Sequence, residues 1–547
     1  MKVSRYFHTV RHLRPVQVYA RLWRYIYRPR PDMRPAPPLR QPLRPWSMCP
    51  GHRQQLLGPQ TFRFLNETRN LAVAADWNSL SSDRLWLYNL HYFGDLTAEE
   101  FSTRFTWHRQ LLERWVAENP PGSGVGWQAY PLSQRIVNWI KWAVAGGDLS
   151  PALVHSLAVQ VRYLSRRLEY HLLGNHLLAN AKALIFAGTF FSGRNRWLHA
   201  GLKLLDSEMR EQFLPDGGHF ERSPMYHSMV TEDLLDLVQL RNLYPEVLGD
   251  AGSGVLQALD PRPMLRWLQV MTHPDGAIAF FNDSAFGMAP SYATLAAYAR
   301  SLSLGLTDRP LAAIESLPES GYVRLENGSA VLIADIGAIG PDYLPGHAHA
   351  GTLSFELSLS AQRVIVNSGV SCYRESAERL RQRGTAAHST LVLDGQNSSD
   401  VWGSFRVGRR ARVLRPRTWR ENNMVCAEAG HHGYRRSSGR PIHWRRWRMD
   451  NHTVYIEDSV EGSGEHLVEI FFYLHPDVRA SFVENGAVSI ENKVGGRICL
   501  IRMATPEALA LEKSTWHPEF GCSIPSFRIA LRRSRSLPAN YLFMVEH

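Results

Sequence analysis

Two histidines separated by one residue, His347 and His349, occur in the stretch GHAHAGTLSFEL, just before a predicted strand. Side chains two residues apart in an extended segment point to the same side, so both rings are expected to face one site. Such a pair can bind a metal, exchange protons, or simply occupy a strand edge. His388, in RGTAAHSTLVLDGQ, precedes another predicted strand, so metal binding and acid–base chemistry are both open at this point.

Two further groups of reactive side chains lie where helices are predicted to begin. In YHLLGNHLLANAKAL, Asn175 and His176 stand at a helix N-terminus, where the helix dipole favours an anion. In PDGGHFERSPMYHSMV, Ser223-Pro224 is typical of a helix start and places Tyr226 in the first turn, within reach of a cleft. The alternatives are an Asn N-cap beside a surface histidine, and a tyrosine packed in the core.

The elements that must position these residues change character once along the chain. From about 97 to 305 apolar residues recur every three or four positions, which predicts helices stacked as a bundle, solenoid or toroid. From about 318 the segments are short, β-branched and alternating, as in an antiparallel sandwich. We therefore predict an α+β multidomain chain: a basic, Pro-rich arm at 1–50, a helical domain at 51–315 and a β-sandwich at 316–547.

Composition narrows the choice of partners. The 547 residues carry a net charge of +12, which favours polyanions such as acidic polysaccharide or anionic lipid. The chain has no zinc-finger, RNP-like or basic-zipper pattern, so nucleic acid is not expected as a partner. Its five cysteines have no regular spacing, which argues against a disulfide framework and a cysteine-based zinc site.

The first 31 residues are basic and aromatic. They lack the apolar core and small-residue cleavage site of a secretory signal, and no stretch of the chain approaches the ~20 apolar residues of a membrane span. They suit an amphipathic helix that lies on a membrane or on the protein's own surface. We expect a cytoplasmic or inner-membrane-associated protein with peripheral membrane contact, the periplasm being the alternative.

Seven motifs occur in a fixed order: RLWLYNLHYFGDL, GNHLLANAKAL, PDGGHFERSPMYH, GHAHAGTLSFEL, TAAHSTLVLDGQ, HHGYRR and FFYLHPDV. In these motifs the chain resembles the heparinase II/III family of polysaccharide lyases along nearly its whole length. The resemblance implies an incomplete (α/α) toroid followed by an antiparallel β-sandwich. It also implies β-elimination on a glycan that contains uronic acid.

The resemblance assigns catalytic roles to four residues. Asn175, with His176 beside it, matches the position that neutralises the uronate carboxylate and so stabilises the enolate-like charge. Tyr226 and His347 match the catalytic tyrosine and histidine, which remove the C5 proton and protonate the leaving oxygen. Which of the two is the base depends on substrate stereochemistry and stays open.

The resemblance also implies a structural zinc in the sandwich. His349 and His388 match two of the ligands, and Asn367 stands where the family has an aspartate. An amide oxygen is a poorer zinc ligand than a carboxylate, so this departure weakens the expectation.

Five further residues are predicted to contact the substrate: Asn89, His91, Tyr92, Trp127 and Glu221. The expected setting is bacterial exopolysaccharide, capsule or O-antigen metabolism. One alternative is a glycoside hydrolase on the same scaffold, which needs two carboxyl groups, with Glu221 and Asp216 as the candidates. Another is a glycan-binding or assembly protein without catalysis.

Overall fold

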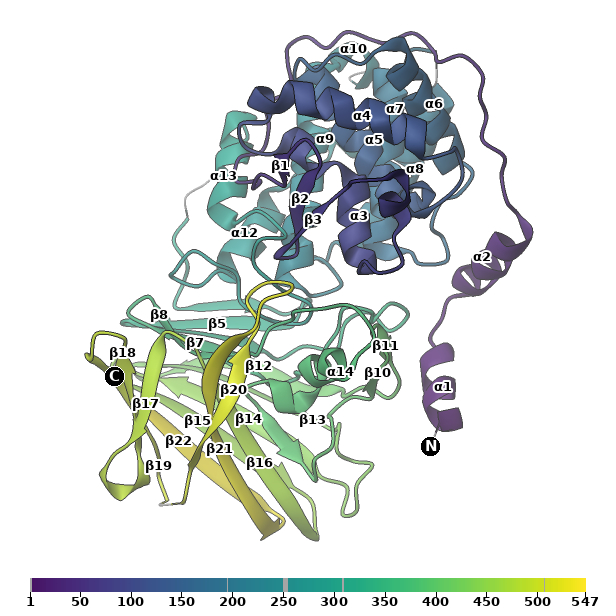
Figure 1. The fold of residues 1–547 in the computed structure, drawn as a ribbon. Coiled ribbons are helices and arrows are strands. Elements are labelled where there is room, and N and C mark those ends of the chain that lie inside the picture. Colours follow the sequence, from purple (N-terminus) through teal and green to yellow (C-terminus); the bar gives the residue numbers. More distant parts are fainter. Residues whose placement is uncertain (1, 194, 249–253, 307–308, 506) are drawn as a thin grey trace.

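The computed structural model describes residues 2–193, 195–248, 254–306, 309–505 and 507–547. Figure 1 shows a helical domain above a β-rich domain, with the N-terminal helices outside both at the right. The predicted fold class, a helical domain followed by an antiparallel β-sandwich, is confirmed.

The N-terminal arm consists of α1 (Lys2–Val10), α2 (Pro15–Ile26) and an extended segment. Proline recurs between residues 29 and 50, which prevents regular helix there. Arg40 fixes this segment to the helical domain, because its guanidinium donates hydrogen bonds of 2.8–2.9 Å to the carbonyls of Gly188, Thr189 and Phe191. These carbonyls at the end of a helix lack helical partners, so a cation is favoured there.

The helical domain begins with a small sheet and continues as helices that pack on one another. The sheet contains β1 (Leu56–Gly58), β2 (Thr61–Phe64) and β3 (Glu67–Asn70). The helices are α3 (Arg84–Tyr92), α4 (Phe105–Glu118), α5 (Ala129–Val144), α6 (Pro151–Leu164), α7 (Gly174–Phe190), α8 (Asn195–Gln212), α9 (Pro224–Leu243), α10 (Pro245–Leu248), α11 (Gly254–Gln257), α12 (Arg262–Val270) and α13 (Tyr292–Ser301). α7 is buried on almost every side, as its continuous apolar sequence predicts, and packs between α5 and α8.

Two antiparallel sheets form the sandwich. The first contains β4 (Ile314–Leu317), β5 (Tyr322–Asn327), β6 (Ala330–Asp335), β7 (Phe355–Leu359), β8 (Gln362–Val366), β9 (Leu391–Leu393), β16 (Glu465–Leu474), β20 (Ala510–Trp516) and β21 (Ile524–Ser536). The second contains β12 (Val413–Glu421), β13 (Met424–His431), β14 (Ile442–Met449), β15 (Thr453–Glu461), β17 (Val478–Phe482), β18 (Val488–Asn492), β19 (Arg497–Met503) and β22 (Ala539–Glu546). Connections hold α14 (Ala377–Arg383), β10 (Val401–Trp402) and β11 (Arg406–Val407). Side chains of β14 and β15 alternate between buried and partly exposed, so one face of the second sheet packs on the first. All five cysteines lie in the described ranges and are free thiols.

A buried ion pair joins two neighbouring strands of the second sheet. Arg445 on β14 contacts the Asp458 carboxylate on β15 at 2.8 Å and also donates hydrogen bonds to the carbonyls of Leu353 and Ser389. His443 Nε2 lies 2.6 Å from the same carboxylate. Arg445 therefore joins the second sheet to the loops that carry the candidate site residues.

Replacing Asp458 by Asn is expected to destabilise the sandwich by about 3–5 kcal/mol, because Arg445 would remain buried without its counterion. Despite burial, Arg445 and His443 lower the pKa of Asp458 to about 2. Because this folded-state pKa is below the ordinary value of about 4, the stabilisation is complete above pH ~4 and is lost as the pH falls toward 2. Thermal unfolding between pH 2 and 7 measures both effects, and an Asn variant with unchanged stability at neutral pH would contradict them.

Candidate active site

Tyr226 and His347 come together at the boundary between the two domains. Tyr226 lies in the first turn of α9, where Ser223 caps the helix by accepting a hydrogen bond from the Tyr226 backbone N–H. The ring centroids of Tyr226 and His347 are 3.9 Å apart. A helix start of one domain and a loop of the other thus place a phenol beside an imidazole.

A buried carboxylate orients His347. Its Nδ1 lies 2.9 Å from Asp283 Oδ2, so the Nδ1–H donates to the carboxylate and Nε2 keeps its lone pair. The Arg379 guanidinium on α14 contacts both oxygens of Asp283, and neither side chain is exposed. Despite burial, Arg379 and the hydrogen bonds hold the pKa of Asp283 well below its usual range. The charged carboxylate therefore orients the imidazole, with Nδ1 toward Asp283 and Nε2 toward Glu221.

Asn175 and His176 begin α7, and Glu221 connects this helix start to His347. The ring of His176 lies 4.4 Å from that of Tyr130 on α5, and its Nδ1 is 3.3 Å from Glu169. Although burial opposes the charged form, Glu169 raises the pKa of His176. The helix N-terminus favours a bound anion, and the raised pKa of His176 favours its cationic form.

Glu221 lies between these two groups. It accepts a hydrogen bond from the Asn175 backbone N–H at 3.4 Å, and its Oε2 is 3.6 Å from His347 Nε2. That Oε2 has no hydrogen-bond partner in the described part of the chain, and burial raises the pKa of the carboxyl. Glu221 is thus a buried carboxyl with one oxygen left to interact with a ligand.

The backbone at the site adopts left-handed conformations at three residues that are not glycine. Their φ angles are +66° at Leu173, +59° at Arg222 and +58° at Asn282. The side chains of Asn282 and Tyr322 donate hydrogen bonds to the Arg222 carbonyl, and these bonds hold Arg222 in place. Gly174 has φ +57°, and a Cβ there would lie 2.4 Å from Leu344. Such conformations cost energy and persist only where the surrounding structure holds them in place.

Three functional groups were missed by sequence reasoning. Asp283 and Arg379 orient His347, and the Tyr373 hydroxyl lies 3.1 Å from that of Tyr226. They occur in FNDSAF and SCYRESAERL, which have no recognisable spacing relative to the histidines. Only the tertiary fold brings them to the site.

Two of the predicted substrate contacts, Tyr92 and Glu221, lie close to the site residues, whereas the amide of Asn89 is bonded within its own helix. The ring of Tyr92 lies 5.8 Å from that of Tyr130, which contacts His176, and Glu221 lies between Asn175 and His347, so both residues are close to the site. Asn89 is mostly buried and donates to the carbonyl of Leu85 in its own helix.

The structure does not support the predictions for His91 and Trp127. His91 is fully buried, with Nε2 2.9 Å from the Trp77 carbonyl and Nδ1 accepting from the Trp115 indole. Trp127 is 4% exposed and packs against Trp115. Both belong to the core of the helical domain, where a glycan does not reach them.

The second carboxyl group that a hydrolase would need is also engaged elsewhere. Asp216 accepts hydrogen bonds from the backbone N–H and hydroxyl of Ser320, at 2.7 and 2.9 Å. It also accepts one from the Gly218 N–H. Asp216 therefore ties a loop of the helical domain to the turn before β5, and does not pair with Glu221 across a cleft.

The residues predicted to hold zinc fit it only in part. His349 Nδ1 and His388 Nε2 face each other at 3.2 Å, and their other ring nitrogens bind Asp283 and the Gly384 carbonyl. Asn367 does not join them, because its amide donates to the Phe280 carbonyl and accepts from the Ser389 N–H. Asp283 contacts His349 at Nε2, not at the nitrogen that faces His388, and among the residues described no His, Cys, Asp or Glu completes a three-ligand group with the pair. Two ligands do not make a structural zinc site, and no chemical step below uses one.

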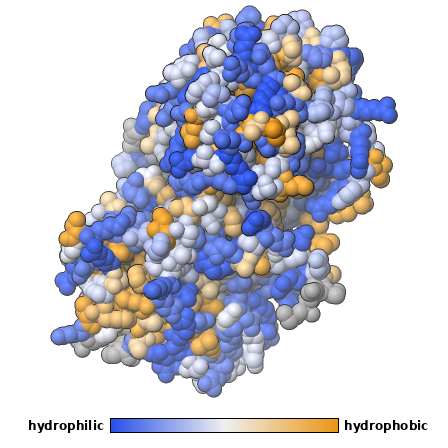
Figure 2. All heavy atoms as spheres, viewed as in Figure 1, coloured by the Kyte–Doolittle hydropathy of each residue, from blue (hydrophilic) through white to orange (hydrophobic). Residues whose placement is uncertain are grey.

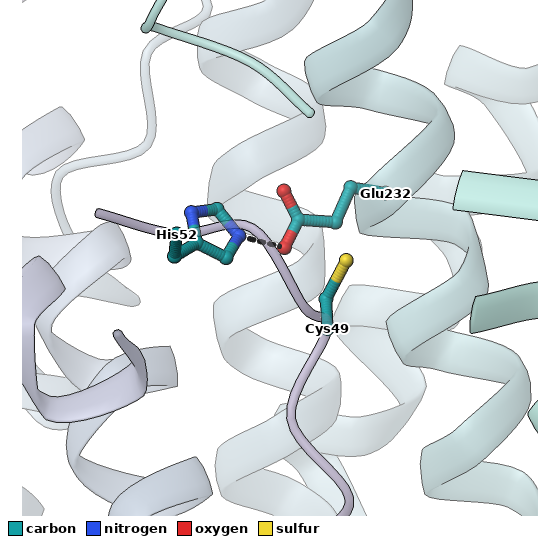
Figure 3. A group of neighbouring side chains, drawn as sticks. All are labelled: Cys49, His52 and Glu232. Carbon is teal, nitrogen blue, oxygen red and sulfur yellow. Dashed lines mark hydrogen bonds and ion pairs between the residues drawn. The ribbon is translucent and has the colours of Figure 1, made fainter. Parts of the chain in front are cut away.

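Another group with metal-binding side chains lies in the helical domain. Cys49, His52 and Glu232 bring three potential ligand atoms within 4.8 Å of one another (Figure 3). His52 Nε2 lies 2.7 Å from Glu232, whose charge raises the pKa of His52, whereas burial raises the pKa of the Cys49 thiol.

The charges around this group balance without a metal ion. The carboxylates are Glu232, Asp233 and Asp236, and the cationic side chains are His52, Lys141 and Lys182. Lys182 Nζ lies 2.5 Å from both Asp233 and Asp236. The arrangement is that of a buried ion-pair network, and Cys49 behaves as a small apolar residue at its edge.

Family models match both domains of the chain. The model described as Heparinase II/III N-terminus matches residues 97–301, and the one described as Heparinase II/III-like, C-terminal matches residues 309–539. The chain belongs to the heparinase II/III family. This confirms the resemblance seen in the ordered motifs, and the two matched regions correspond to the helical domain and the sandwich.

Two curated relatives of this chain have different names and align with it over different lengths. Heparin-sulfate lyase of Pedobacter heparinus is 26% identical over 324 residues, which cover 52% of this chain and 47% of the relative. FtsZ-localized protein C of Caulobacter vibrioides is 27% identical over 492 residues, covering 82% of this chain and 79% of the relative. The chain thus aligns with only about half the length of the lyase.

Solved structures share the fold. The crystal structure of heparinase III has a TM-score of 0.64 at 18% identity, over 86% of this chain and 78% of that one. Heparan sulfate lyase HepC of Pedobacter heparinus has a TM-score of 0.59 at 19% identity, over 89% of this chain and 81% of that one. The heparinase II/III fold therefore extends over both domains.

Proposed function

We propose that this protein is a polysaccharide lyase that cleaves a uronic-acid-containing acidic glycan by β-elimination. The observation that carries the proposal is the contact of Tyr226 with His347, whose Nε2 faces the buried carboxyl of Glu221. The family membership supports it, and the net charge of +12 suits a polyanionic substrate.

The first requirement of the reaction is to neutralise the uronate carboxylate. Asn175 and His176 at the start of α7 supply hydrogen bonds and positive charge, and burial raises the pKa of Glu221, which favours its protonated form. A protonated carboxyl can donate a hydrogen bond from its free oxygen to the substrate carboxylate. Charge that develops on that carboxylate as C5 loses its proton is thereby stabilised.

Proton transfer then uses the two rings. His347 Nε2, oriented by Asp283, removes the C5 proton, and the electron pair forms the C4–C5 double bond while the C4–O bond breaks. The leaving oxygen takes the hydroxyl proton of Tyr226. Burial, with Tyr373 and Asp283 nearby, raises the pKa of Tyr226, so the phenol stays protonated and suits the role of acid.

Replacing Glu221 by Gln tests the protonated carboxyl. As the pH rises, the wild-type carboxyl ionises beside the substrate carboxylate, and KM is expected to rise about 10-fold from the repulsion. A neutral amide does not ionise, so KM of the Gln variant should stay flat over the same pH range. Initial rates at several substrate concentrations measure this, and an identical pH dependence of KM in both proteins would contradict the assignment.

The activity itself is tested on a panel of acidic polysaccharides, including bacterial exopolysaccharide, capsule and O-antigen, the proposed setting of the reaction. Elimination creates a conjugated 4,5-double bond that absorbs in the ultraviolet, whereas hydrolysis creates only a reducing end. A rise in reducing ends without ultraviolet absorbance would favour a hydrolase. The absence of both signals would contradict the proposal that the protein is an enzyme.

A second candidate is a binding or assembly protein that uses the cleft without turnover. It is favoured by one observation: the alignment with FtsZ-localized protein C covers 82% of the chain, whereas that with the Pedobacter lyase covers 52%. Saturable glycan binding without product formation, unchanged when Tyr226 is replaced by Phe, would favour this function.

A further inference from the structure

The first two helices expose nine large apolar side chains, which we call the arm surface. Each of its members is between 46% and 77% exposed. They are Tyr6, Phe7, Val10, Val18, Tyr19, Leu22, Trp23, Tyr25 and Ile26. In Figure 2 hydrophobic residues gather at the right-hand edge, where Figure 1 places α2. A soluble monomer rarely exposes so many large apolar side chains together, so this surface requires an explanation.

The opposite side of α2 is attached to the protein, so the apolar side is held outward. Gln17 is buried and donates to the Tyr343 carbonyl at 3.2 Å. Arg14 pairs with Glu211 at 2.5 Å and lies 3.7 Å above the Tyr343 ring. Val18, Leu22 and Ile26 are spaced by four residues on the free side.

α1 is attached in the same way. The Trp402 indole donates to the Thr9 hydroxyl at 3.1 Å, and that hydroxyl lies 3.3 Å from the Val407 carbonyl. Phe7 and Val10, three residues apart, remain exposed. The arm surface is therefore presented by two docked helices and does not result from a detached segment.

The ionisable side chains in the segment that contains α1 and α2 are almost all of one sign. The first 31 residues contain one lysine, seven arginines and no aspartate or glutamate. Arg5, Arg11, Arg21 and Arg28 are exposed, and Arg21 and Arg28 line a hollow between α2 and the helical domain. Aromatic and aliphatic residues flanked by arginines are characteristic of helices that lie in the headgroup layer of an anionic membrane.

We propose that α1 and α2 bind the surface of an anionic lipid bilayer, with the arm surface inserted at the level of the headgroups. Among the described residues, none of the helices has the length and apolar character of a membrane-spanning segment. An acidic glycan would satisfy the arginines but gains nothing from Val18, Leu22 or Ile26. A second copy of the chain would oppose arginines to arginines, so the bilayer is the partner that fits both features.

Sedimentation of the full chain with vesicles tests the proposal independently of catalysis. Vesicles of phosphatidylglycerol and phosphatidylcholine should pellet the protein at an ionic strength of about 0.1 M, and vesicles of phosphatidylcholine alone should pellet at least 10-fold less. The double variant Leu22→Gln/Ile26→Gln should bind anionic vesicles at least 10-fold more weakly. These side chains are exposed, so the fold should persist, and circular dichroism verifies it.

A matched control separates the arm from general surface hydrophobicity. Leu57 and Val494 are also exposed, and Leu57→Gln/Val494→Gln should leave vesicle binding unchanged. A second variant, Arg5→Gln/Arg21→Gln/Arg28→Gln, should lose the preference for anionic lipid. Equal pelleting with both vesicle types, no pelleting with either, or equal binding by the Leu22/Ile26 and control variants would overturn the proposal. Loss of acidic-oligosaccharide binding in the arginine variant with vesicle binding intact would instead identify a glycan surface.

Discussion

Replacing Tyr226 by Phe is expected to lower kcat by about 10³-fold, because the leaving oxygen would lose its proton donor. The substitution removes a single oxygen whose partner is the Tyr373 hydroxyl, so the ring packing against His347 should persist. Substrate affinity should change little, since Asn175, His176 and Glu221 are untouched. Ultraviolet product formation and equilibrium binding to the same glycan measure the two effects.

Tyr455→Phe on β15 is the matched control, because it removes a tyrosine hydroxyl from the sandwich, outside the candidate site. It should leave kcat unchanged. A Tyr226→Phe enzyme that keeps more than about a tenth of the wild-type kcat would show that another group protonates the leaving oxygen.

The second large effect is expected at Asp283. Asp283→Asn should lower kcat by about 10²–10⁴-fold, because an amide does not hold the His347 imidazole in the tautomer with a free Nε2. It should also destabilise the protein by about 3–5 kcal/mol, because Arg379 would be left buried without a counterion. Steady-state kinetics and thermal unfolding report the two losses separately.

A double variant distinguishes positioning of His347 from simple stability. In Asp283→Asn/Arg379→Met the uncompensated buried charge is gone, so most of the lost stability should return, while kcat should stay low. Recovery of both stability and kcat would mean that Asp283 acts only as a counterion to Arg379.

Much of the architecture could be predicted from the sequence because it depends on local periodicity. Apolar residues every three or four positions gave the helices, and alternation gave strands such as β14 and β15. The pairing of Tyr226 with His347 was predicted only through the family resemblance, since 120 intervening residues separate them in sequence. No local pattern places a residue of a helix start beside one of a distant loop.

The failures have equally specific physical reasons. His91 and Trp127 look like binding residues because their side chains are polar or aromatic, but only the packed structure shows that Trp77 and Trp115 contact them. Asp283 was missed because its partners, His347, His349 and Arg379, come from two other segments. Buried charge networks are a property of the tertiary fold, and a single sequence does not reveal them.

The division of the candidate site between two domains has a consequence for the proposed activity, both in the intact chain and in the separated domains. Tyr226 and Glu221 come from the helical domain, whereas His347 and Arg379 come from the sandwich. A small rotation of one domain against the other would separate acid from base while each core stayed folded. Catalytic activity would then depend on the alignment of the domains and would be lost at a lower temperature than the one at which either domain unfolds. Neither domain, produced alone, could turn over substrate, but mixing the two could reconstitute an active pair.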